Sequence, residues 1–221
     1  MIQALIFDFD GLILDTETPE FVCWQNIYRE HGFDFPHERW GSIIGGSGHS
    51  DFDAAQHLAH LSQGRLDSAS LRARNHLESH DIILKQGPLP GVMDYLQDAQ
   101  RLGLKLAIAS SSDRNWVHTH AKRIGVFDYF DDVITAEDVA IGRTKPNPDL
   151  FLVALNRLQV QKEAAIVFED SPNGVKAANR AGIFVVAVPN GATSMLSMQG
   201  ANLILNSLSE KSLSQLLDTV K

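Results

Sequence analysis

Apolar residues recur along this chain in short runs, and between the runs apolar positions are spaced three or four residues apart. A short apolar run is typical of a buried parallel strand, whereas the wider spacing indicates an amphipathic helix. Strands are predicted over 5–8, 106–110, 133–135, 166–169, 185–188 and 203–205. Helices are predicted over 92–102, 116–124, 148–158 and 174–181. Because strand and helix alternate, we expect an α/β fold with a doubly wound parallel sheet covered on both faces.

One block of sequence, 16–85, breaks this alternation because it contains no convincing strand. Pro19 suits the first turn of a helix. The expected helices in this block cover 19–31, 52–61 and 68–79. A segment rich in proline and glycine, 87–91, then marks the return to the sheet and a candidate hinge. We therefore expect a catalytic core formed by 1–15 and 86–221, into which 16–85 is inserted as an α-helical cap.

Composition narrows the class of protein. With 44% apolar residues in a chain of 221, the sequence can bury a substantial core. A net charge of −8 argues against binding to nucleic acid or to an acidic membrane, and no apolar run reaches the length of a membrane span. A single cysteine, Cys23, excludes an internal disulfide. The first residues lead into a strand and do not resemble a signal peptide, so we expect a cytoplasmic protein. A monomer is the default expectation.

Two carboxylates follow the first predicted strand. Asp8 and Asp10 are separated by one residue, so they start on the same side of an extended chain, and Gly11 allows a sharp turn after them. Open α/β sheets bind ligands at the carboxyl ends of their strands. Neighbouring carboxylates repel each other unless a cation or a proton lies between them. The pattern favours a Mg²⁺ ion and a phosphate, although an Asp here can also simply form a turn or cap a helix.

The string from Phe7 to Thr16, FDFDGLILDT, resembles the signature of the haloacid dehalogenase-like (HAD) hydrolases, chiefly their phosphatase branch and the group that includes β-phosphoglucomutase. The resemblance implies a Rossmann-like core with a helical cap that closes over the site. It also implies that Asp8 is the nucleophile, which forms an aspartyl-phosphate, and that Asp10 is the general acid and base. Family members that cleave carbon–halogen bonds generally lack the second Asp, so Asp10 favours phosphate chemistry.

The other family motifs occur in order, so the resemblance covers nearly the whole chain. Ser110 and Ser111, after the second predicted strand, are similar to the motif that binds the phosphoryl oxygens, although such serines often only cap a helix. Lys145 precedes Pro146, as in the family's Lys-Pro motif, which implies that it neutralises the phosphoryl group during transfer. Arg143 is the alternative for this role.

Two acidic residues at the end of the strand at 166–169 complete the implied metal site. The resemblance implies that the side chains of Asp8 and Asp170 and the main-chain carbonyl of Asp10 bind Mg²⁺. Glu169 would bind it directly or through water. A helix-capping role for Asp170 is the simpler alternative.

The cap is expected to choose the substrate. A glycine-rich segment, 44–50, contains Gly46 and His49 and is the candidate loop over the site, because its glycines permit close approach of the backbone. A flexible connection between helices is the alternative. Thr16 is the remaining candidate substrate contact.

The sequence alone leaves two main candidates for the reaction, a phosphatase and a sugar-phosphate mutase. Sugar-phosphate mutases similar to this chain carry a His and an Arg where this chain has Glu20 and Gly48, although Arg72 and Arg74 could still bind a distal phosphate. A mutase needs cationic cap groups for its bisphosphate intermediate. We therefore favour a Mg²⁺-dependent phosphatase of a small phosphorylated metabolite, such as a sugar phosphate, over a β-phosphoglucomutase-like mutase. A phosphorylatable switch similar to receiver domains is a third possibility, but those domains lack such a cap.

Overall fold

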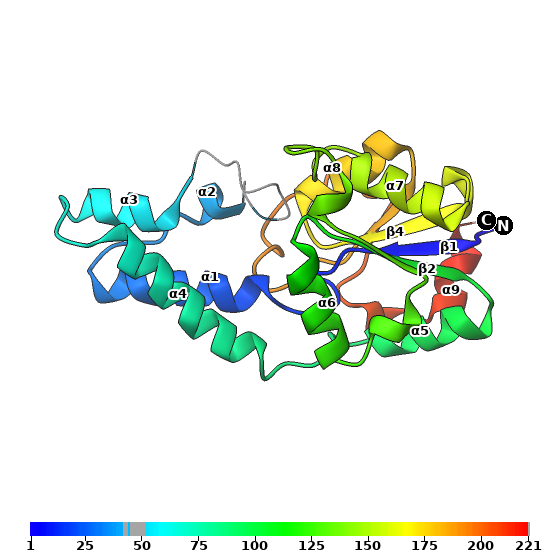
Figure 1. The fold of residues 1–221 in the computed structure, drawn as a ribbon, viewed down its shortest axis with the longest axis horizontal. Helices are drawn as coiled ribbons and strands as arrows, with labels where there is room; N and C mark the ends of the chain where they lie inside the picture. Colours follow the sequence, from blue (N-terminus) through cyan, green and yellow to red (C-terminus); the bar gives the residue numbers. More distant parts are fainter. Residues whose placement is uncertain (42–43, 45–51, 221) are drawn as a thin grey trace.

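A computed structural model describes residues 1–41, 44 and 52–220 of the chain. At its centre is a parallel sheet of six strands in the order β3-β2-β1-β4-β5-β6 (Figure 1). The strands are β1 (Ala4–Phe7), β2 (Lys105–Ala109), β3 (Asp132–Ile134), β4 (Ala165–Glu169), β5 (Phe184–Ala187) and β6 (Leu203–Ile204). The predicted α/β fold with a doubly wound parallel sheet is confirmed.

Helices cover both faces of the sheet (Figure 1). On one face are α7 (Asp149–Leu158) and α8 (Pro172–Ala181), and on the other are α5 (Val92–Arg101), α6 (Arg114–Arg123) and α9 (Leu213–Thr219). Successive side chains of a strand point to opposite faces. Accordingly, Leu5 and Phe7 of β1 join the apolar cluster of α5, α6 and α9, whereas Ala4 and Ile6 join that of α7 and α8. Burial on both faces explains why β1 is apolar at every position.

The topology places a crevice beside β1. The chain runs outward from β1 through β2 to β3 and then returns to β4 on the other side of β1, so the strand order reverses between β1 and β4. Ligands bind at this kind of reversal, outside the carboxyl ends of the strands. Phe7 pairs with Phe168 in the β1–β4 register, so Asp8 and Glu169 are the next residues at the same level.

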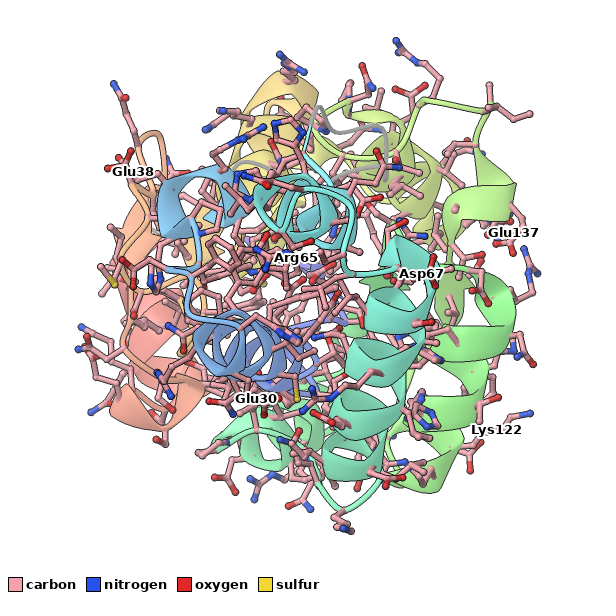
Figure 2. The ribbon with its side chains drawn as sticks, turned by 90° about the vertical axis from the view of Figure 1, so that its left-hand side faces the viewer. Glu30, Glu38, Arg65, Asp67, Lys122 and Glu137 are labelled. Carbon is pink, nitrogen blue, oxygen red and sulfur yellow. The ribbon has the colours of Figure 1, made fainter. Side chains whose placement is uncertain are left out.

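Among the described residues, four helices between β1 and α5 lie at one end of the molecule (Figures 1 and 2). They are α1 (Glu17–Glu30), α2 (His37–Gly41), α3 (Ala54–Leu61) and α4 (Ser68–Ile83). A separate apolar cluster, which includes Trp24, Tyr28 and Phe35, holds them together. The Tyr28 hydroxyl donates to the Ala54 carbonyl at 2.7 Å. This packing agrees with a helical block at 16–85, and its behaviour as a cap domain remains a prediction.

Arg123 of α6 forms hydrogen bonds at the junction between this block and the core. Its guanidinium donates to the main-chain carbonyls of Ile83, Leu84 and Gln86, at 2.7–3.0 Å. Cationic groups at the carboxyl end of a helix also interact favourably with its dipole. The contact fixes the end of α4 beside α6, which brings residues of both helices to the same cavity.

Helices α2 and α9 were not predicted. Helix α2 has only five residues, too few for a periodic pattern to be visible. Helix α9 buries Leu213 and Leu216, and it begins with a capping box formed by Ser212 and Gln215, a signal that the sequence does carry. No helix within the described ranges is long and apolar enough to cross a membrane.

Candidate active site

Three carboxylates meet where β1 and β4 end. Asp8 follows the last residue of β1, and its N–H donates to the Phe168 carbonyl of β4 at 3.0 Å. Glu169 ends β4, and Asp170 follows it. Oxygens of Asp8, Glu169 and Asp170 lie within 4.8 Å of one another, and all three side chains are buried. The parallel register of the two strands thus brings together residues that are about 160 positions apart in sequence.

A buried lysine joins this cluster. The Lys145 ammonium pairs with Asp8 and, at 2.6 Å, with Glu169, and only 1% of its side chain is exposed. Arg143, the alternative in sequence, instead pairs with Asp149 at 2.8 Å and is half exposed. The structure therefore brings Lys145, and not Arg143, to the candidate nucleophile.

The described residues do not balance the charge of the cluster. Three ionised carboxylates and one ammonium would leave a net charge of −2. Burial raises the pKa of Asp8 and of Asp170, and Lys145 only partly opposes this. Burial alone would lower the pKa of Lys145, but the charges of Asp8 and Glu169 raise it above its usual value. Oxygen donors with excess negative charge are what Mg²⁺ requires, so these residues fit that ion.

Asp170 is held in place by Asn190, which the sequence analysis did not single out. The Asn190 amide donates to Asp170 Oδ2 at 2.7 Å and to the Gly11 carbonyl at 3.0 Å. Gly11 has φ = +81°, and a Cβ there would lie 2.2 Å from Asp170 Oδ2. Ser171, and not Asp170, caps α8, since its side chain accepts from the Gly174 N–H at 3.0 Å. The capping alternative for Asp170 is therefore wrong.

Hydrogen bonds from several described side chains orient the Asp10 carboxylate. Its Oδ1 accepts from the Thr16 hydroxyl at 3.1 Å and from the Trp116 indole N–H at 2.8 Å. Its Oδ2 accepts from the hydroxyls of Ser110 at 3.1 Å and Ser112 at 2.7 Å. Thr16 and Ser110, which were predicted to contact substrate, therefore form hydrogen bonds with Asp10. Their contact with substrate remains a prediction. Trp116 and Ser112 were not predicted as site residues, although Ser112 lies in the same serine cluster as Ser110 and Ser111.

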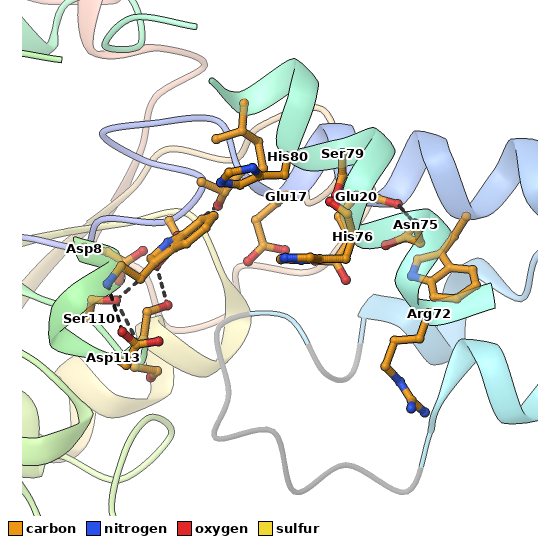
Figure 3. A pocket seen from close by; sticks show the side chains of 17 residues that line it. Asp8, Glu17, Glu20, Arg72, Asn75, His76, Ser79, His80, Ser110 and Asp113 are labelled. Atoms are coloured by element: carbon orange, nitrogen blue, oxygen red, sulfur yellow. Dashed lines mark hydrogen bonds between the residues drawn. The ribbon is translucent and has the colours of Figure 1, made fainter. Parts of the chain in front are cut away.

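A cavity of about 490 Å³ opens between the core and α1 and α4 (Figure 3). Asp8, Asp10 and the serines at 110–112 line its core end. Residues of α1 and α4 line the opposite end, which we call the cap end: Glu17, Glu20, Trp24, Arg72, Asn75, His76, Ser79 and His80. This volume is typical of sites that bind small molecules.

Comparison with known proteins identifies the family. Residues 5–188 match the family model of haloacid dehalogenase-like hydrolases. The chain belongs to this family. It is similar to "Putative phosphatase YhcW" of Bacillus subtilis, with 43% identity over 99% of this chain and 97% of the relative. It is also similar to "Fructose-1-phosphate phosphatase YqaB" of Escherichia coli, with 32% identity over 84% and 95% of the two chains.

A solved structure agrees with this chain in fold. The crystal structure of a "putative beta-phosphoglucomutase" from Thermotoga maritima aligns with a TM-score of 0.75 and 27% identity, over 98% of this chain and 99% of that one. The sequence-based prediction of a HAD-like hydrolase of the phosphatase type is confirmed.

Several predicted contacts of this HAD hydrolase stay untested. Gly46 and His49 lie outside the described residues. Ser111 lines the cavity. The main-chain carbonyl of Asp10 remains a predicted metal ligand. The carboxylate of Asp10 is not part of the acidic cluster formed by the described residues.

Magnesium should stabilise the folded protein even without substrate. The ion neutralises the excess charge of the cluster, and a ligand at 100 times its Kd adds about 2.7 kcal/mol. For a domain of this size we expect Tm to rise by about 5–10 °C. Differential scanning fluorimetry with MgCl₂, against NaCl at equal ionic strength, measures this shift. Asp170→Asn should remove most of it, whereas Asp34→Asn, an exposed site, should not. An unchanged wild-type Tm would contradict the metal site.

Proposed function

We propose that the protein is a Mg²⁺-dependent phosphatase that hydrolyses a small phosphomonoester through an aspartyl-phosphate on Asp8. The observation that carries this proposal is the contact of the buried Lys145 ammonium with Asp8 inside a carboxylate cluster beside the cavity. A carboxylate held in this way can attack phosphorus, while the ammonium reduces the repulsion between two anions. Bound Mg²⁺, held by Asp8, Asp170 and Glu169, would supply further positive charge beside the phosphoryl group.

The residues of the chain divide the reaction into two displacements. In the first, an Asp8 oxygen bonds to phosphorus, the ester P–O bond breaks, and Asp10 gives a proton to the departing alkoxide. In the second, Asp10 takes a proton from water, the water oxygen bonds to phosphorus, and the bond to Asp8 breaks. Asp10 lines the same cavity as Asp8. The hydroxyls of Thr16, Ser110 and Ser112 and the indole of Trp116 keep its carboxylate oriented for both proton transfers.

The proposal is tested by phosphate release from a panel of several dozen phosphorylated metabolites, each with Mg²⁺ and with EDTA. We expect release from at least one small phosphomonoester, dependent on Mg²⁺. The relative YqaB is named for fructose 1-phosphate, which belongs on the panel. Absence of release from every compound would contradict the proposal. Conversion of β-glucose 1-phosphate to glucose 6-phosphate without phosphate release would identify a mutase instead.

A further inference from the structure

The two ends of the cavity differ in the positive charge that they can offer a substrate. At the core end, Asp8 lines the cavity, pairs with the buried Lys145 and belongs to the candidate metal site. The cap end holds Glu17 and Glu20 of α1, which are three positions apart and therefore lie on the same face of the helix. Both line the cavity, and in Figure 3 Glu17 lies between the core residues and those of α4. A phosphate bound at Asp8 would thus direct the rest of its molecule toward two carboxylates.

No basic group of the described residues neutralises these two glutamates. Neither forms an ion pair with a described lysine, arginine or histidine. Arg72 lines the cap end, but its guanidinium is bonded to Asp53. Arg74 pairs with Glu30 at 2.6 Å and with Glu78 at 2.7 Å and does not line the cavity. Both arginines that were candidates to bind a distal phosphate therefore form ion pairs with carboxylates of the protein.

The surroundings of the two glutamates already disfavour negative charge. Burial raises the pKa of Glu20 to about 7. Burial raises the pKa of Glu17 well above its usual value, and the nearby charges of Glu20, Asp10 and Asp8 raise it further. A second anion on the substrate would add to this repulsion. A hydroxyl can instead donate a hydrogen bond to a carboxylate, and an ammonium can pair with it.

The remaining groups at the cap end are hydrogen-bonding and aromatic, which suits a polyhydroxylated molecule. Asn75 and Ser79 of α4 are neutral hydrogen-bonding groups, Trp24 of α1 offers an aromatic surface, and the imidazoles of His76 and His80 of α4 also line this end. The Asn75 amide donates to the Glu20 carbonyl at 3.1 Å, which fixes α4 against α1 at this point. The cap end therefore combines hydrogen-bonding groups and two histidines with two carboxylates that form no ion pair with a described lysine, arginine or histidine.

We propose that Glu17 and Glu20 select the substrate by charge. The site would take phosphomonoesters whose remaining part is neutral or carries an ammonium group, such as a sugar or an amino sugar. It would reject those that carry a second phosphate or a carboxylate, because an unpaired like charge in the pocket is an effective means of discrimination. This inference rests on the proposed function, and it also disfavours a mutase, whose intermediate is a bisphosphate.

The test uses hexose phosphates of similar size that differ in charge. Glucose 6-phosphate, glucosamine 6-phosphate, 6-phosphogluconate and glucose 1,6-bisphosphate are measured as competitors of the best panel substrate, with Mg²⁺ at pH 8. We expect 6-phosphogluconate and the bisphosphate to bind at least about tenfold more weakly than glucose 6-phosphate. Glucosamine 6-phosphate should bind at least as tightly as glucose 6-phosphate. Equal binding of the neutral and acidic compounds, or competition by none of them, would overturn the inference.

Variants of Glu17 and Glu20 test whether these two carboxylates cause the difference in binding between neutral and acidic compounds. In Glu17→Gln/Glu20→Gln the tenfold difference should fall below about threefold, and in Glu20→Lys it should reverse. Glu38→Gln, an exposed cap residue outside the cavity (Figure 2), should keep the wild-type ratio. A folded double variant with the wild-type ratio would overturn the inference.

These outcomes separate the inference from the proposed function. If Mg²⁺-dependent release of phosphate persists and only the charge preference is absent, the inference fails alone. If no phosphomonoester on the panel is hydrolysed, the proposed function fails and the inference fails with it.

Discussion

Asp8→Asn should lower kcat by about 10⁴-fold or more, since removal of a nucleophile leaves only substrate binding and electrostatic stabilisation. The amide is nearly the same size as the carboxylate but cannot attack phosphorus. The folded structure should survive, because the substitution removes one of three clustered carboxylates and Lys145 keeps Glu169 as its partner at 2.6 Å. Without Mg²⁺ we expect Tm to stay the same or to rise.

The measurement is phosphate release from the best panel substrate, with Tm recorded on the same samples. Asp34→Asn makes the same chemical change at an exposed position of the helical block and should leave kcat within about twofold of wild type, as surface substitutions usually have small effects. Mass spectrometry of wild-type protein mixed rapidly with substrate should detect a phosphorylated peptide that contains Asp8. If Asp8→Asn retained activity within tenfold of wild type, Asp8 would not be the nucleophile.

The fold and the centre of the site are predictable because their signals are local. Each strand of the core is an apolar run, and each candidate group at the centre follows such a run or stands in a motif with a turn residue. Asp8 and Asp170 are examples, because each comes directly after a buried strand. The reversal of strand order between β1 and β4 then brings these local signals together without further information.

Trp116 and Asn190, which help to orient Asp10 and Asp170, were not predictable, because nothing in the local sequence around them indicates a role in the site. Trp116 lies in the first turn of α6 and reaches Asp10 only when α6 packs against the sheet. Asn190 follows β5, the strand next to β4, and reaches both Gly11 and Asp170. An indole and an amide are common side chains with many structural uses, so only the tertiary structure shows which atoms they meet.

The close approach of α8 to Glu169 could not be predicted from the sequence, because it depends on the lack of a side chain at Gly174. A Cβ added to Gly174 in α8 would lie 1.8–2.0 Å from the Glu169 carboxyl group, so the helix can approach Glu169 only with glycine there. In sequence, Ser-Pro-Asn-Gly is simply a helix start. The close approach also allows Glu169 Oε2 to accept from the Ser171 hydroxyl at 3.2 Å, while its other oxygen pairs with Lys145.

Lys145→Met should both inactivate and destabilise the protein. Methionine fills a similar volume but leaves three buried carboxylates without their cation, and loss of one partner of a buried ion pair costs about 3–5 kcal/mol. Loss of the ammonium beside Asp8 should also lower kcat by about 10²–10³-fold. Urea unfolding without Mg²⁺ measures the first effect, and phosphate release with Mg²⁺ measures the second. Lys85→Met, at an exposed position, should change stability by less than about 0.5 kcal/mol.

The loss of folding stability in Lys145→Met should increase as pH rises. Burial raises the pKa of Asp8 to about 8 in the folded protein, and that of Asp170 also lies above its ordinary value of 3.8. Between about pH 4 and pH 8 the folded state then binds more protons than the unfolded state, so stability falls as pH rises. Without Lys145 the pKa of Asp8 rises further, so the fall in stability continues above pH 8, where that of the wild type levels off. Lys145→Met should therefore lose more stability relative to wild type at about pH 9 than at pH 5, and an equal loss at both would show that the ammonium does not offset these carboxylates.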